Sequence, residues 1–326
     1  MTWLALRRRR KTLLVFLALA MALDVWMVAN GHTSANALSH TGLCQTFACT
    51  QPTELYAPAR QAVVVDLLLL LLPLGLGLTL GVGLVAGEAE RSTNRLVWTQ
   101  DVTRTRWYVT SLAVSVGIAG VIAAVVLPVA HWWAGVAWVD LPGTLTLGGD
   151  RIQPDMFPVS GIVPLAYTVF AVTLGAAIGA VVRRVPWAAA VTVVLYLALA
   201  VVMVTTVRQG FAPTGFLVDG TTDSAQYAPW PTPPPWNVGY EYRVIPGVVR
   251  GPDAPPPVAV FEACRPYGEH PQDLVDCMRR RGVEGGFVTQ SPAHYWRLQW
   301  VEALLYAGLA MVLAGVGLVA VRRTQD

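Results

Sequence analysis

Long apolar runs alternate with short polar segments along the chain, and this alternation predicts six membrane-spanning helices. Each run holds 19 to 26 residues, and about 20 helical residues cross a hydrocarbon core of about 30 Å. The runs cover residues 12–30, 61–86, 108–130, 159–182, 186–206 and 300–321. Lipid offers the backbone no hydrogen-bond partner, and the alternation typical of a membrane barrel is absent. We therefore expect an all-α polytopic membrane protein.

The distribution of Lys and Arg predicts the orientation of these helices. With the N-terminus in the cytoplasm, the inside segments hold 13 basic residues in 40, and the two short outside loops hold two in 58. Those inside segments are 1–11, 87–107, 183–185 and 322–326. This is a strong positive-inside bias, and it places both termini in the cytoplasm. The composition agrees, because 13% of the 326 residues are charged, against about 25% in soluble domains.

The spans divide the chain into a bundle and one large outside segment. Residues 1–206 hold the first five helices and a cytoplasmic loop at 87–107, and residues 300–326 hold the sixth helix and a tail. Residues 207–299 are expected to form an extracytoplasmic domain, with a strand at 240–245 and a helix at 271–281. A cleavable signal peptide is the alternative at the N-terminus, but the apolar run there extends well beyond a signal-peptide core.

All four cysteines fall in the predicted outside segments, which favours disulfides. The local pairs Cys44–Cys49 and Cys264–Cys277 are preferred among three pairings, and bridges between the loops stay open. Zinc is an alternative because histidines lie near both pairs, but no zinc-ligand spacing supports it. Free thiols are the third alternative, and we expect no metal site.

Polar and small residues inside the spans indicate where helices meet. Asp24, Asp66 and Glu302 are acids within apolar runs, where a charge usually faces protein or a water-filled path. They are candidates for a translocation path, and hydration near the interface or pairing with a neighbouring helix is the alternative. Glycine pairs at i and i+4 predict close helix packing. These pairs are Gly77 with Gly81, Gly83 with Gly87, and Gly175 with Gly179.

The chain has no recognisable catalytic or nucleotide-binding motif of its own. A P-loop needs a lysine after a glycine-rich turn, and the single lysine, Lys11, follows arginines. HExxH and GxSxG are also absent. We therefore expect no enzymatic activity, no cofactor bound by this chain and no nucleic-acid partner.

The cytoplasmic loop at 87–107 combines arginine with tryptophan, residue types that are enriched at the energetic centres of protein interfaces. Glu88, Arg91 and Arg95 share one surface of a short helix. From the residues alone, two interpretations stand equally: a docking elbow for another protein, or a loop that contacts anionic lipid.

The stretch "RLVWTQDVTRTRW" (95–107), preceded by acids, resembles a recurrent sequence of bacterial ABC transporter permeases of the type-2 export class. Ser92 and Asp101 depart from that pattern. Residues 161–188 and 295–323 also resemble this family, whereas the outside domain is poorly covered. The matching positions are Glu90, Thr93, Arg95, Leu96, Trp98, Thr99, Gln100, Val102, Arg104, Arg106 and Trp107.

The resemblance implies a permease subunit in a bacterial plasma membrane. Its loop at 87–107 would dock on a separate ATP-binding subunit, present in two copies, which would bind ATP and Mg. A second permease subunit, identical or different, would complete the transporter, and the apolar spans suit export of a hydrophobic or amphipathic small molecule or peptide. The implied interface residues are Glu88, Glu90, Arg91, Arg95, Trp98, Gln100, Arg104, Arg106 and Trp107.

A membrane sensor or immunity protein is the alternative function, with the outside domain binding a ligand or an antimicrobial peptide. Such a protein needs a cytoplasmic output, and the inside segments are too short to fold into one. A polytopic enzyme ranks third because no catalytic constellation supports it.

Overall fold

The chain folds into two compact units in the computed structural model. One, the bundle unit, comprises residues 1–208 and 296–326, and the other, the inserted unit, comprises residues 209–295. The structure describes residues 2–40, 53–90, 103–136, 152, 156–218, 236–244, 257–265 and 271–323. The sequence predicted the inserted segment at residues 207–299, which is two residues longer at its start and four residues longer at its end.

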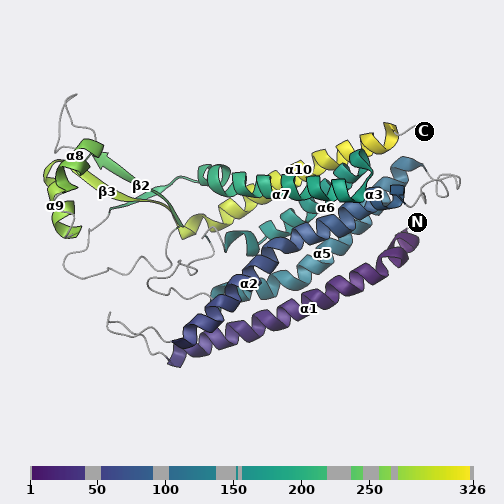
Figure 1. Cartoon of the computed structure of the whole chain (residues 1–326), viewed down its shortest axis with the longest axis horizontal. Coiled ribbons are helices and arrows are strands. Elements are labelled where there is room, and N and C mark those ends of the chain that lie inside the picture. The colour runs from purple at the N-terminus through teal and green to yellow at the C-terminus, as the bar shows by residue number, and fades with distance from the viewer. Residues whose placement is uncertain are drawn as a thin grey trace. The chain divides into compact units, whose positions relative to one another are not determined.

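The bundle unit is built from helices throughout the residues that the structure describes (Figure 1). Within the described residues, six helical stretches are long and apolar enough to cross a membrane, which agrees with the predicted number of spans. The helices are α1 (Thr2–His40), α2 (Thr53–Leu76), α3 (Gly83–Glu90), α5 (Arg104–Val136), α6 (Val163–Val182), α7 (Val185–Val202) and α10 (Tyr295–Arg323). Proline stands in the first turn of α6 and of α7, where its missing N–H costs no intrahelical bond.

Short irregular turns extend or connect these helices. The π-helical turn η1 (Gly77–Val82) joins α2 to α3, so the second span is one continuous stretch of helical turns. A second π-helical turn, η3 (Met203–Val207), and the 3₁₀ turn η4 (Arg208–Gly210) continue α7. The 3₁₀ turn η2 (Phe157–Val159) precedes α6. Such turns mark places where packing overrides the regular helix geometry.

Helix α6 forms the centre of the bundle unit. Fifteen of its twenty residues are buried, and 67% of its apolar window is enclosed, against 17 to 39% for the other five spans. The glycines of α6 and η1 let the two backbones touch. A Cβ added at Gly81 would collide with the carbonyl oxygen of Val172, and one at Gly175 would collide with that of Gly77.

This contact confirms two of the three predicted glycine pairs as packing positions. Gly77 with Gly81 and Gly175 with Gly179 face each other's helices, whereas a Cβ at Gly83 or Gly87 would meet nothing within 4 Å. Small residues let transmembrane helices approach closely, and dispersion contacts then hold them together. The distinction between the pairs depends on which face of the helix meets α6, and spacing alone does not encode it.

The inserted unit combines a small sheet with two short helices. Strands β1 (Gly215–Val218), β2 (Trp236–Val244) and β3 (Val283–Gln290) form an antiparallel sheet in the order β1-β3-β2. Helices α8 (Pro257–Cys264) and α9 (Pro271–Arg280) are joined by the disulfide Cys264–Cys277. The strand predicted at 240–245, the helix at 271–281 and this disulfide are thereby confirmed; Cys44 and Cys49 lie outside the described residues.

A small core holds the inserted unit together. Val260, Met278 and Val283 pack around the two bonded cysteines, all of them buried. Small domains have little apolar surface to bury, and they commonly rely on disulfides for stability. Covalent linkage of α8 to α9 therefore limits the unfolded ensemble of this unit.

The glycine contact makes a direct prediction about stability. Gly81→Ala should lower the apparent Tm of the detergent-solubilised protein by about 5 °C, because the added methyl group meets backbone that must move, at a cost of about 1–3 kcal/mol. Gly83→Ala is the matched control, since its Cβ enters open space, and it should leave the Tm unchanged or slightly raised. The Tm is the temperature at which heating halves the height of the size-exclusion peak of the solubilised protein. Equal losses in both variants would refute the assigned packing.

Candidate functional site

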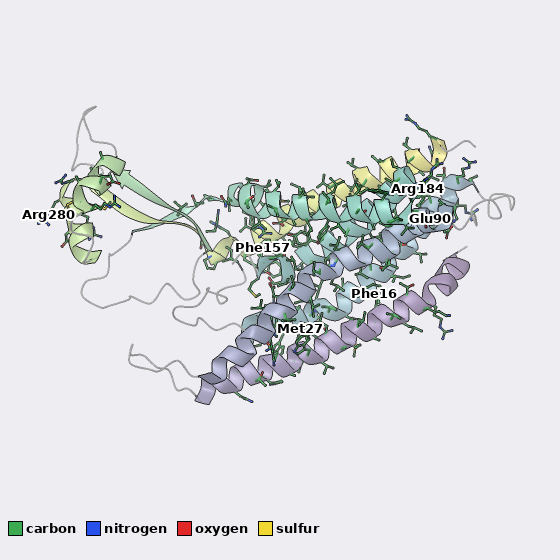
Figure 2. All side chains as sticks on the ribbon, in the orientation of Figure 1. Phe16, Met27, Glu90, Phe157, Arg184 and Arg280 are labelled. Carbon is green, nitrogen blue, oxygen red and sulfur yellow. A yellow bond between two sulfur atoms is a disulfide. The ribbon has the colours of Figure 1, made fainter. Side chains whose placement is uncertain are left out.

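One end of the bundle unit collects arginines, most of them exposed, and is called the arginine end here. At this end α1 begins, α3 ends, α5 begins, a two-residue turn joins α6 to α7, and α10 ends (Figure 1). Figure 2 labels Glu90 and Arg184 at this end. The arginines at the described helix ends are Arg104, Arg106, Arg183, Arg184, Arg322 and Arg323.

A hydrogen bond fastens the end of α3 to the start of α7. Glu90 is the last residue of α3, and its Oε1 accepts the backbone N–H of Val185 at 2.7 Å. The first N–H groups of a helix have no intrahelical partner, and a negative charge there is favourable. Glu90 therefore completes a helix that begins 95 residues later in the chain.

A second hydrogen bond fastens the start of α5 to the end of α10. Arg322 Nε donates to Thr105 Oγ1 at 2.9 Å. The preceding Thr103 caps α5, because its Oγ1 accepts the backbone N–H of Arg106 at 3.4 Å. The two helix ends that border segment 91–102 are thus each bonded to another helix of the bundle.

The predicted interface residues divide into several groups in the structure. Glu90 and Arg106 are exposed, and Glu88 and Arg104 are partly buried. Trp107 is buried in the main core of the bundle unit, so its ring supports α5 from within. The remaining predicted residues, Arg91, Arg95, Trp98 and Gln100, lie outside the described residues.

Beside Trp107, Tyr108 secures α5 against α10. Its side chain is 1% exposed, and its hydroxyl occupies the space that a Cβ at Gly317 would need. The Cα of Ala177 on α6 lies 3.2 Å from that same Cβ position. Glycine at position 317 therefore allows α5, α6 and α10 to converge just inside the arginine end.

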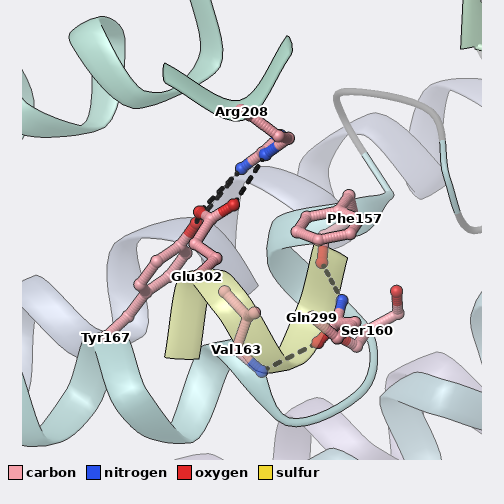
Figure 3. Close-up of polar contacts among 7 residues, drawn as sticks. All are labelled: Phe157, Ser160, Val163, Tyr167, Arg208, Gln299 and Glu302. Carbon is pink, nitrogen blue, oxygen red and sulfur yellow. Dashed lines mark hydrogen bonds and ion pairs between the residues drawn. The ribbon is translucent and has the colours of Figure 1, made fainter. Parts of the chain in front are cut away.

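Away from the arginine end, a buried ion pair joins α10 to the extension of α7 (Figure 3). Arg208 Nε lies 2.8 Å from Glu302 Oε2, and Arg208 Nη2 lies 3.0 Å from Glu302 Oε1. Both side chains are fully buried. Tyr167 on α6 donates its hydroxyl to Glu302 and accepts from Arg208 Nη2 at 3.2 Å. The Arg208 guanidinium also lies over the Phe157 ring, 4.4 Å from its centroid.

This geometry compensates both buried charges. The carboxylate receives a two-pronged guanidinium contact and a hydroxyl donor, which is the strong form of a charge-assisted hydrogen bond. A charge buried without such partners in an apolar bundle is strongly destabilising. The cluster therefore ties α6, α7 and α10 to one another.

One turn before Glu302, the Gln299 side chain caps α6 (Figure 3). Its Oε1 accepts the N–H groups of Ile162 and Val163 at 3.0 and 2.9 Å. Its Nε2 donates to the carbonyls of Phe157 and Ser160, both at 3.1 Å. One amide thus satisfies four backbone groups at and just before the start of a largely buried helix.

Sequence reasoning missed the partner of Glu302. It placed Arg208 in the outside segment 207–299, whereas η3 and η4 continue α7 and bury Arg208 completely. A signal was present, because a lone acid in a transmembrane run requires a partner and Arg208 is the first basic residue after the fifth run. Glu302, a candidate for the translocation path, is enclosed in this ion pair.

The other two acids of the predicted path lie at nearly the same depth in the bundle. Asn30 Nδ2 on α1 donates to Gln61 Oε1 on α2 at 3.4 Å, which aligns the two helices. Asp24 lies six residues before Asn30 and Asp66 five residues after Gln61, or about 9 and 8 Å along antiparallel axes. Asp24 is 8% exposed and Asp66 is partly buried. Depth alone does not establish a path between them.

These features define a multi-pass helical membrane protein with a basic end and a buried polar cluster. A family model described as ABC-2 membrane transporter related matches residues 16–208, which is more than half of the chain. The chain therefore belongs to the ABC-2 membrane transporter-related family, as its resemblance to type-2 permeases predicted. No curated protein and no solved structure matches it. The family match ends at the last residue of the bundle unit before the inserted unit begins.

The ion pair can be tested by a double-variant cycle. Arg208→Met should destabilise the protein by about 3–5 kcal/mol, because it leaves the Glu302 charge buried alone. The double variant R208M/E302M should recover most of the lost Tm, because two apolar side chains in a buried site leave no charge without a partner. Arg265→Ala is the control: its pair with Glu262 is 73% and 57% exposed and contributes little. If the double variant is as unstable as R208M, an unpaired Glu302 charge is not the cause of the instability, and the assigned ion pair is contradicted.

Proposed function

We propose that this chain is the membrane-spanning permease subunit of an ABC exporter. A separate ATP-binding subunit would dock on the loop 87–107 and drive the helices. One observation carries this proposal beyond family membership: the ends of α3 and α5 that border the loop are bonded to α7 and α10. The loop is thus mounted on the bundle at both ends.

This mounting gives a physical route for coupling. A push on the loop is delivered through Glu90 to the first turn of α7 and through Thr105 to the last turn of α10. Helix α3 directly follows η1, whose backbone contacts α6. Movement of the docked subunit would therefore pass through α3 and α5 to α6, α7 and α10.

ATP chemistry would be supplied by the partner, because the sequence of this chain has no P-loop. Two copies of the ATP-binding subunit would each bind ATP and Mg, and a second permease subunit would complete the complex. The arginine end would face the cytoplasm, in keeping with the positive-inside rule. The inserted unit would then lie outside a bacterial plasma membrane, where its disulfide is stable.

A hydrophobic or amphipathic cargo suits the apolar spans. Asp24 and Asp66, at similar depth on α1 and α2, are the proposed polar positions on its path. Glu302 is assigned a structural role instead, because its carboxylate is already paired with Arg208.

A second function is favoured by the inserted unit itself. It has its own sheet, core and disulfide, so it could bind a ligand or an antimicrobial peptide as a sensor or immunity protein does. Recovery of an ATP-binding partner distinguishes the two functions, because a ligand sensor requires no such subunit.

The docking site is tested by a pull-down from the native host in gentle detergent, followed by mass spectrometry. The wild-type chain should recover a P-loop protein in near-stoichiometric amount. Reversal of charge in R95E/R104E should lower the recovery at least about tenfold, because repulsion replaces charge complementarity at the interface. Arg265→Glu, at an exposed position of the inserted unit, should leave recovery unchanged. If the wild type recovers no P-loop protein while a known ABC complex stays intact, the permease assignment fails.

A further inference from the structure

The turn between α6 and α7 has an unusual backbone at Arg183. This residue has φ 57° and ψ 4°, in the left-handed region, and among the described residues it is the one position other than glycine with positive φ. Its N–H donates to the carbonyl of Gly179 at 3.1 Å and closes α6. Glycine is the usual residue at such a helix end, and a side chain there costs roughly 1–2 kcal/mol. Strain of this kind points to a side chain with a function.

Both arginines of this turn are exposed. Neither the Arg183 nor the Arg184 side chain has a hydrogen bond or ion pair with another part of the chain that the structure describes. Glu90, the acid at the end of α3, binds the backbone N–H of Val185 instead. Two guanidinium groups with five donors each are therefore left for an external acceptor.

The position of the turn favours a protein over lipid as that acceptor. It follows α6, the most enclosed of the six spans, and residues 171–180 of α6 are all buried. Lipid headgroups meet a helical bundle at its rim, whereas the end of a central helix faces whatever covers the end of the bundle. Exposed apolar side chains on either side of the turn, Val181 on α6 and Trp187 on α7, are the ones expected to meet lipid.

We infer that Arg183 and Arg184 form a second docking contact for the ATP-binding subunit, and that they receive an acidic surface of that subunit. The inference rests on the proposed function and extends it beyond the loop 87–107. Guanidinium groups pair with carboxylates in a two-pronged geometry that lysine does not reproduce. The Glu90–Val185 bond joins this contact to the first one, so both elements would receive the same movement.

The variant Arg183→Gly distinguishes an effect on docking from an effect on folding stability. Glycine adopts φ 57° without strain, so this variant should keep or raise the Tm while it lowers recovery of the P-loop protein about threefold. R183E/R184E should lower recovery about tenfold. R280E/R281E is the matched control, with the same charge change at two exposed arginines of the inserted unit, and should recover as much as wild type. Wild-type recovery by both R183G and R183E/R184E would overturn the inference while leaving the proposed function standing.

Photo-crosslinking identifies what covers the turn. Benzoylphenylalanine in place of Arg184 should crosslink to the P-loop protein in native membranes, whereas the same probe at Trp187 should label lipid. Labelling of phospholipid alone at position 184 would replace the protein contact with a headgroup contact and overturn the inference. If the wild-type chain captures no P-loop protein, the proposed function fails and this inference fails with it.

Discussion

The buried pair of Arg208 and Glu302 is the constraint on which much of the bundle depends. Two charges without solvent persist only when each satisfies the other, and here the pair also engages Tyr167 and lies against Phe157. The pair therefore fixes where α7 ends and how α10 is turned about its axis. With that rotation set, Gln299 reaches the start of α6, where it accepts two backbone N–H groups and donates to two carbonyls just before the helix. Three helices, α6, α7 and α10, are positioned by one electrostatic requirement.

The contacts weaken from this cluster toward the arginine end. The cluster is a fully buried, two-pronged ion pair, and the middle of the bundle is held by backbone contact between η1 and α6. At the arginine end, Glu90–Val185 and Arg322–Thr105 are single, solvent-exposed hydrogen bonds, each worth about 1 kcal/mol. In the proposed transporter, helix ends held by single hydrogen bonds would move more readily than the helices around the buried ion pair. A docked subunit would then move this end of the bundle while the ion pair keeps the geometry of the other end.

The sequence predicts those features that depend on local pattern. Six apolar runs, two glycine pairs, the helix at 271–281 and the Cys264–Cys277 pair are each encoded within a few turns of chain. The Arg208–Glu302 and Glu90–Val185 contacts join residues 94 and 95 positions apart, so no local spacing reveals them. The left-handed backbone at Arg183 could not be predicted either, because glycine is the residue that usually indicates this conformation at a helix end. The roles of all nine predicted interface residues stay predictions.

The ion pair has a further consequence for the chain entropy of the inserted unit. The chain leaves the bundle unit after Arg208 and returns through the helix that carries Glu302, so the ion pair holds the two ends of the inserted segment close together. Residues 209–301 are thereby closed into a loop by a contact that lies within the bundle unit. Closing a loop in this way removes conformations from the unfolded segment, so less chain entropy is lost when the segment folds.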